Sequence, residues 1–230
     1  MVNIESGKDF ITDVIDWDVV NWRKCLPFFE KDNFCFAGKK ALAIGEKDGG
    51  LSLWLAAKGS SVISTDLNGV SDRAKEKHAA YHLQDKIKYS EQNILSLNYP
   101  DETFDIVIFK SVLGALREKE KQQAAINEIR RVLKPGGTLF FAENLVSTSL
   151  HTFLRKKFIK WASYWRYITI SEAKELCAEF TRVETKTAGF WEHSAERKGK
   201  ECFLGSWILF LRRLFRKVGT ISFLYPQKNK

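Results

Sequence analysis

A glycine-rich turn and a single acidic residue lie about twenty positions apart in the N-terminal half of the chain. The turn Gly45-Glu46-Lys47-Asp48-Gly49-Gly50 follows an apolar run at 40–44, and Asp66 ends a second apolar run 21 residues after Gly45. Glycine lets the backbone approach a ligand, and a helix start offers free N–H groups. A carboxylate at the position of Asp66 accepts hydrogen bonds from ribose hydroxyls. The spacing therefore predicts a nucleoside site.

Three further groups in the C-terminal half have side chains suited to acid–base chemistry or to ligand binding. Glu143 is our first candidate for a base that orients or deprotonates a hydroxyl, although a structural acid bonded to backbone N–H groups is equally open. His151 is the second, although a lone histidine at a helix start is more often a cap or a surface residue. Trp165-Arg166-Tyr167 could stack on a sugar ring and hold an anion, or simply pack a helix end.

The elements that position these residues alternate between strand and helix. Apolar runs predict strands at 40–44, 61–65, 87–89, 104–109 and 138–143, and periodic segments predict helices at 51–58, 71–83 and 119–133. Two further strands are expected at 182–187 and 220–224. This order predicts an α/β fold with an open, mostly parallel seven-stranded sheet, helices on both faces and a C-terminal antiparallel hairpin.

The chain is expected to divide into an N-terminal helical cap, residues 1–39, and a larger domain, residues 40–230. The cap prediction rests on apolar positions at helical spacing within 8–31. The C-terminal third is expected to be helical and basic, with helices at 150–161, 171–180 and 203–217.

The net charge of +9 is unevenly distributed along the 230 residues. The segment 197–230 has nine Lys and Arg against one acid, and 150–170 has five with none. This favours an anionic acceptor or an anionic membrane surface near the C-terminal third, while solvated helix faces are the plain alternative. The four Cys show neither CxxC nor metal-ligand spacing, so we expect reduced thiols, no metal and a cytoplasmic protein, with peripheral contact at the inner membrane face as an option.

An ordered series of motifs over about residues 38–145 resembles the class I S-adenosylmethionine (SAM)-dependent methyltransferases. The series consists of the glycine turn, Asp66, Asn93-Ile94, the run 104–107, and Leu133-Lys134-Pro135-Gly136-Gly137 before the fifth strand. The runs 49–56 and 109–114 also look like a bacterial subgroup associated with surface-polysaccharide synthesis. The resemblance implies a Rossmann-like methyltransferase fold with SAM as cofactor.

The resemblance also implies roles for individual residues. The backbone from Gly45 through Glu46 and Lys47 to Gly49 would pack against the methionine and ribose portions of SAM. Asp66 would hold both ribose hydroxyls, Leu67 would pack on the adenine, and Asn93 and Ile94 would contact its edge and face. Lys110 and Ser111 would face the methionine portion and the methyl group. Helix-cap and turn roles are the alternatives for Asp66 and Asn93.

The sequence departs from the family pattern at two positions. Ala43 stands where the family commonly has an acid before the glycine turn, and Lys47 replaces the middle glycine. Glu46 or Asp48 could compensate for the missing acid. A nicotinamide dinucleotide site is the alternative for such a turn, but Lys47 also breaks that pattern.

The function expected from these features is SAM-dependent methyl transfer to a hydroxyl of a small-molecule or saccharide-linked, anionic acceptor. From a different class, the alternative is a catalytically silent methyltransferase-like module that binds a protein partner or an anionic membrane. Methylation of nucleic acid is disfavoured, because no RNA-binding module is recognisable and no Asn/Asp-Pro-Pro-aromatic motif follows the fourth strand. The sequence does not indicate the oligomeric state.

Overall fold

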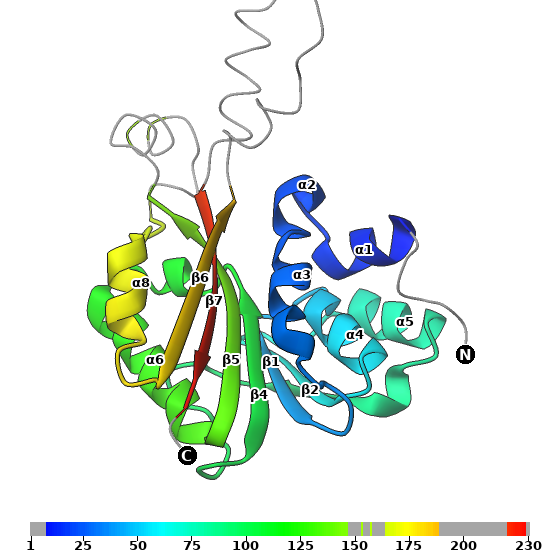
Figure 1. Ribbon diagram of the computed structural model, residues 1–230. Coiled ribbons are helices and arrows are strands. Elements are labelled where there is room, and N and C mark those ends of the chain that lie inside the picture. The colour runs from blue at the N-terminus through cyan, green and yellow to red at the C-terminus, as the bar shows by residue number, and fades with distance from the viewer. Residues whose placement is uncertain (1–7, 147–152, 154–156, 158–163, 189–219, 229–230) are drawn as a thin grey trace, which may run out of the picture.

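The computed structural model describes residues 8–146, 153, 157, 164–188 and 220–228, and Figure 1 shows them around one central sheet. The predicted basic helices 150–161 and 203–217 lie outside the described residues, apart from Phe153 and Lys157. Among the helices that are described, none has both the length and the apolarity needed to cross a bilayer.

Five parallel strands form the core of the sheet, as the apolar runs predict. They are β1 (Lys40–Ile44), β2 (Ser61–Asp66), β3 (Ile87–Glu91), β4 (Phe104–Lys110) and β5 (Leu133–Leu145). The full strand order is β3-β2-β1-β4-β5-β7-β6. Because β1 lies between β2 and β4, the winding of the chain reverses at β1 and opens a crevice at its carboxyl end.

The last two strands run against the others. β7 (Thr220–Gln227) pairs antiparallel with β5, and β6 (Arg182–Ala188) pairs antiparallel with β7. The segment that joins them lies outside the described residues, so the predicted hairpin connection stays a prediction.

Helices cover both faces of the sheet (Figure 1). On one side lie α1 (Lys8–Ile15), α2 (Val19–Trp22), α3 (Cys25–Phe29), α4 (Gly50–Ala57) and α5 (Asp72–Ala80), and on the other lie α6 (Lys119–Val132) and α8 (Ile170–Leu176). Short 3₁₀ turns, η2 (Lys31–Asn33), η3 (Gln84–Lys86) and η4 (Leu113–Leu116), connect them.

Strand side chains alternate between two apolar clusters, because successive residues point to opposite faces of a sheet. In β5, Phe140 packs with Phe29 beneath the N-terminal helices, whereas Phe141 stacks on Phe109 in the cluster beneath α6. Each cluster fixes the end of β4 and β5 relative to one layer of helices. The carboxyl edge of the sheet is therefore held from both sides.

The N-terminal segment forms three short helices, where periodicity alone suggests one helical stretch. Asp16 (φ 67°) and Asp18 (φ 46°) adopt left-handed backbone conformations that end α1 and turn the chain into α2. Trp22 and Phe29 are fully buried in one apolar cluster with residues of the sheet and of α4, so this segment packs tightly onto the larger domain. The division at residue 39 stays a prediction.

The contact between α1 and α4 depends on the absence of a side chain at Gly50. A Cβ atom at this position would collide with the carbonyl oxygen of Val14. Because that oxygen belongs to the last turn of α1, the cap rests directly on the first residue of α4.

We predict that Gly50→Ala loosens α1, since overpacking of this kind costs about 1–3 kcal/mol of unfolding free energy. Hydrogen exchange of the amides at 8–15 measures it, and their exchange should become faster. Gly38→Ala is the matched control, because a Cβ added at Gly38 would meet no neighbouring atom. At its φ of 72°, this substitution introduces backbone strain without a steric clash. Equal exchange of α1 in both variants would contradict the prediction.

Candidate functional site

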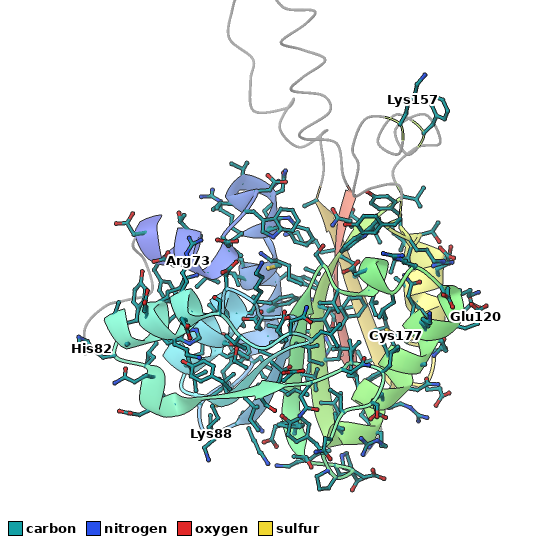
Figure 2. The ribbon with its side chains drawn as sticks, turned by 180° about the vertical axis from the view of Figure 1, so that it is seen from behind. Arg73, His82, Lys88, Glu120, Lys157 and Cys177 are labelled. Carbon is teal, nitrogen blue, oxygen red and sulfur yellow. The ribbon has the colours of Figure 1, made fainter. Side chains whose placement is uncertain are left out.

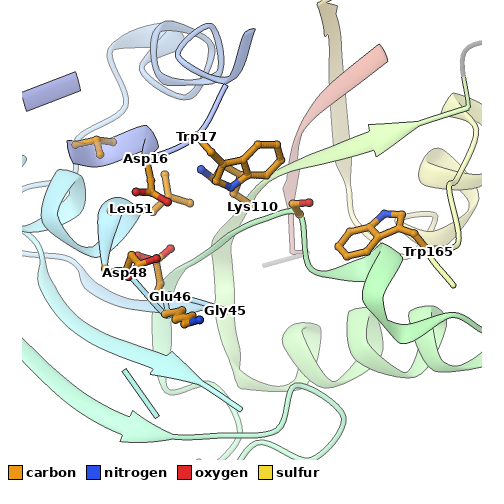
Figure 3. Close-up of a pocket in the computed structure, with 13 residues that line it drawn as sticks. Asp16, Trp17, Gly45, Glu46, Asp48, Leu51, Lys110 and Trp165 are labelled. Carbon is orange, nitrogen blue, oxygen red and sulfur yellow. The ribbon is translucent and has the colours of Figure 1, made fainter. Parts of the chain in front are cut away.

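A pocket of about 470 Å³ opens at the carboxyl ends of β1 and β4. Figure 3 shows its walls: the glycine turn and the start of α4 (45–51) on one side, Trp165 on the other, and Trp17 from the cap above. Lys110, the last residue of β4, lies between them, and Ser111, which follows it in the chain, also lines the pocket. The turn, these two residues and Trp165, which the sequence assigns to cofactor and acceptor, thus line one cavity.

Helix α5 holds the glycine turn in place through a buried histidine. His78 Nε2 lies 2.7 Å from the Gly49 carbonyl oxygen, and Nδ1 lies 2.9 Å from the hydroxyl of Tyr89. Because a carbonyl oxygen only accepts, Nε2 donates, and the neutral ring accepts the Tyr89 proton at Nδ1. Burial lowers the pKa of His78 and so favours this neutral form.

The close fit of the histidine ring also explains the residue type at position 49. Gly49 has φ 68°, and a Cβ there would lie 2.6 Å from His78 Nε2. The role of His78 could not be predicted from the sequence, because a histidine inside a predicted helix has no distinguishing pattern.

Lys77, the neighbour of His78, joins the cap to the same turn. Its ammonium donates to the carbonyl oxygens of Asp13 and Asp48, each at 2.9 Å. Tyr81, which caps the C-terminal end of α5, donates to the Asp13 carboxylate at 2.8 Å. One face of α5 therefore fixes the end of α1 and the glycine turn together.

Glu46 is the buried acid of the turn. Its Oε2 accepts hydrogen bonds from the backbone N–H (2.9 Å) and hydroxyl (3.1 Å) of Ser52. Burial raises the pKa of Glu46, while the Ser52 hydrogen bonds and the charge of Lys110 oppose that shift. Lys47 is exposed at the same turn, so its charge is in contact with solvent.

The end of β4 places one cation and one hydroxyl in the pocket. The Lys110 ammonium donates to the Ile15 carbonyl and lies 5.2 Å and 5.7 Å from the ring centres of Trp17 and Trp22. Ser111 adopts φ 58°, and its hydroxyl oxygen accepts from the Asn144 side chain at 3.1 Å. Left-handed backbone at a non-glycine residue is strained and is concentrated at functional sites.

Four residues with predicted adenosine contacts lie outside this pocket, at the ends of β2 and β3. Asp66 accepts from the Asn68 backbone N–H at 3.2 Å, and Leu67 is 57% exposed. The Asn93 side-chain oxygen accepts from the Leu95 N–H at 3.0 Å, while Ile94 is buried in the core cluster. Their roles toward adenosine stay predictions.

In the predicted substrate motif, Trp165 lines the pocket, whereas Arg166 and Tyr167 make contacts within the protein. Trp165 packs so closely on Gly114 that a Cβ there would overlap the indole ring. The guanidinium of Arg166 instead donates to Gln122 Oε1 (2.5 Å) and Glu172 Oε1 (2.6 Å), which ties this segment to α6 and α8. Tyr167 is buried, and a substrate role for either residue stays a prediction.

Glu143 lies behind the pocket wall rather than in it. It is 1% exposed, and its Oε2 accepts the Gly114 N–H at 3.3 Å. Within the described part of the chain, no hydrogen-bond partner reaches its Oε1. Burial raises the pKa of Glu143 to about 8, so the carboxyl is largely protonated at neutral pH. His151 lies outside the described residues.

Comparison with known proteins agrees with this geometry. Residues 42–141 match a family described as a methyltransferase domain, and this range runs from the middle of β1 to within β5. Over these residues the chain is similar to the class I methyltransferases. S-adenosylmethionine is the cofactor of this family.

Curated relatives of the methyltransferase domain resemble part of the chain. A probable methyltransferase, ltbC, from Aspergillus luteorubrus is 34% identical over 110 residues, which cover 45% of this chain and 38% of that protein. The ubiquinone/menaquinone biosynthesis C-methyltransferase UbiE from Citrobacter koseri is 34% identical over 90 residues, 39% of this chain and 35% of that protein. The matches thus span less than two-fifths of either relative.

A solved structure shows the same fold over most of the chain. The phosphoethanolamine N-methyltransferase 2 of Haemonchus contortus, in complex with phosphomonomethylethanolamine and S-adenosylhomocysteine, superposes with a TM-score of 0.67. It is 18% identical and covers 91% of this chain and 53% of that chain. Such a likeness supports the Rossmann-like methyltransferase fold.

We predict that His78→Leu weakens binding of S-adenosylhomocysteine about tenfold, because the Gly49 carbonyl loses its buried donor, a loss of roughly 1–3 kcal/mol. His78→Gln can place an amide N–H near the same oxygen and should recover most of the affinity. Calorimetry at pH 7.5 measures both. Equal affinities for the two variants would contradict a role for this hydrogen bond.

Glu143 gives a prediction about pH. Its pKa in the folded protein, about 8, exceeds the ordinary value of 4.5, so its stabilising contribution is present below pH 4.5 and is lost as pH rises to about 8. Glu143→Gln should therefore raise the free energy of unfolding at pH 8.5 relative to the wild type and change it little at pH 4.5. Chemical denaturation at the two pH values measures this. The exposed Glu120→Gln is the control, and parallel curves for wild type and Glu143→Gln would refute the assignment.

Proposed function

We propose that this chain binds SAM in the pocket between β1 and β4 and transfers the methyl group to a small-molecule acceptor. The observation that carries the proposal is the glycine turn at the point where the sheet reverses its winding, held there by His78 and Lys77. Open α/β sheets bind their ligands at this point. The matched methyltransferase domain contains the whole turn.

Methyl transfer requires alignment of three atoms and exclusion of water, because the sulfonium already activates the methyl carbon. In the proposed arrangement, the turn holds the methionine and ribose portions, and the acceptor enters between Trp17 and Trp165. Trp17 is 43% exposed on the cap side, which leaves part of its ring available to a ligand.

The acceptor atom is proposed to be a hydroxyl oxygen on a saccharide-linked or other anionic molecule. The basic segments of the C-terminal third supply the argument for negative charge. UbiE and the Haemonchus enzyme are named as C- and N-methyltransferases, so carbon and nitrogen acceptors are the alternatives that product analysis must distinguish.

Glu143 stays our candidate for the group that orients or deprotonates the acceptor hydroxyl, although its carboxyl lies outside the pocket lining, against Gly114, which in turn contacts the Trp165 ring. Contact with an acceptor would require this wall to move. With a pKa of about 8, the carboxyl is mostly protonated at neutral pH, and its ionised fraction, which can accept a proton, grows as pH rises toward 8.

Calorimetry with S-adenosylhomocysteine tests the proposal on the full chain, and we expect saturable binding. Asp66→Ala should weaken it by about 1.5–3 kcal/mol, the range for hydrogen bonds to a charged group. Asp72→Ala, an exposed acid in the first turn of α5, should leave it unchanged. A folded wild type that does not bind up to millimolar ligand would defeat the enzyme proposal and favour the silent binding module.

A further inference from the structure

The ammonium group of Lys110 has more donors than the surrounding protein uses. A lysine ammonium carries three N–H bonds. Among the described residues, the Ile15 carbonyl is the acceptor within hydrogen-bond distance, and the nearby rings of Trp17 and Trp22 offer only their π-faces. Two N–H bonds are therefore left for a ligand or for water.

The position of Lys110 directs these two N–H bonds to the pocket. The side chain is half-buried and lines the pocket, and Figure 3 shows it next to Trp17, between the glycine turn and Trp165. Burial lowers the pKa of Lys110, while the charges of Glu46 and Asp16 oppose that shift. A desolvated cation with open donors is stabilised most by an anionic oxygen.

The two nearby acids, Glu46 and Asp16, do not form an ion pair with the Lys110 ammonium. The Glu46 carboxylate receives its hydrogen bonds from Ser52, and Asp16 lies toward solvent at the rim. Neither is within ion-pair distance of Lys110 among the described contacts, where the ammonium is instead bonded to a neutral carbonyl. The pocket therefore holds a cation that, among the described contacts, has no ion pair with a carboxylate of its walls, although Asp16, Glu46 and Asp48 line the same cavity.

We propose that Lys110 is an anion-binding residue that takes a carboxylate or comparable anionic oxygen of the ligand. This rests on the proposed function, which supplies two sources: the carboxylate of the methionine portion of the cofactor, and an anionic oxygen of the acceptor. In both cases the bound anion compensates the repulsion between the lysine and the cationic sulfonium, so that SAM can occupy the pocket.

Lys110→Met, which removes the charge but keeps an unbranched apolar chain, tests the proposal by calorimetry. Three probes separate the sources: S-adenosylhomocysteine, 5′-methylthioadenosine, which lacks the carboxylate, and 4-hydroxybenzoate added to the S-adenosylhomocysteine complex. Lys110→Arg keeps the charge, and Lys121→Met removes one exposed lysine far from the pocket. If Lys110→Met does not fold, Lys110→Gln keeps a donor for the Ile15 carbonyl and gives the same comparison.

Two results support the proposal. A loss of tenfold or more for S-adenosylhomocysteine, with methylthioadenosine unchanged, assigns Lys110 to the cofactor carboxylate. Unchanged nucleoside binding, with a tenfold loss for 4-hydroxybenzoate, assigns it to the acceptor. In both cases Lys110→Arg should stay within about threefold of the wild type, and Lys121→Met should have no effect.

Other results overturn it. If Lys110→Met binds every probe with an affinity within twofold of the wild type, the lysine binds no anion. The same conclusion follows if the wild type does not bind 4-hydroxybenzoate and Lys110→Met binds both nucleosides as the wild type does. Equal losses for both nucleosides would show that it only supports the cap. A wild type that binds neither nucleoside defeats the proposed function itself and this inference with it.

Discussion

Two carbonyl oxygens at the meeting point of the cap and the sheet obtain their donor from one lysine, and the site depends on this contact. Asp13 lies near the end of α1 and Asp48 lies in the glycine turn, and Lys77 donates to the carbonyl oxygens of both. Lys110 adds a second link, because it donates to the Ile15 carbonyl, which also accepts the Trp17 backbone N–H. Because buried polar groups without partners are costly, these contacts hold the cap in one position over the pocket.

Because the cap is held over the sheet, segments that are far apart in the sequence line the same pocket. The cap contributes Trp17, the end of β4 and the residue after it contribute Lys110 and Ser111, and the segment after 163 contributes Trp165. Figure 2 shows from behind how side chains fill the space between the sheet and its helices, so the cavity remains at the carboxyl edge. The shape of the pocket depends on side chains that do not line it, such as His78, which contacts Gly49.

Much of the fold could be predicted from the sequence, because the buried parallel strands are continuous apolar runs between glycine-rich turns. The five strands and the end of α6 before Lys134-Pro135 follow this pattern. The breaks in the cap could not be predicted, since nothing in Asp16 or Asp18 demands a left-handed conformation. The helix predicted at 171–180 begins at Ile170 and ends at Leu176, and the capping box of Thr169 with Glu172 fixes its start.

The glycine turn and the β4 end belong to the predicted cofactor residues, and the structure brings them into one pocket. His78, Lys77 and Trp17 could not be predicted, because their importance comes from contacts between segments distant in sequence. The Gly114–Trp165 contact is of the same kind. A single hydrogen atom at position 114 sets how far the indole sinks toward η4, and with it the width of the entrance. An alanine there would displace the indole ring, so a single methyl group would reshape the pocket on the Trp165 side.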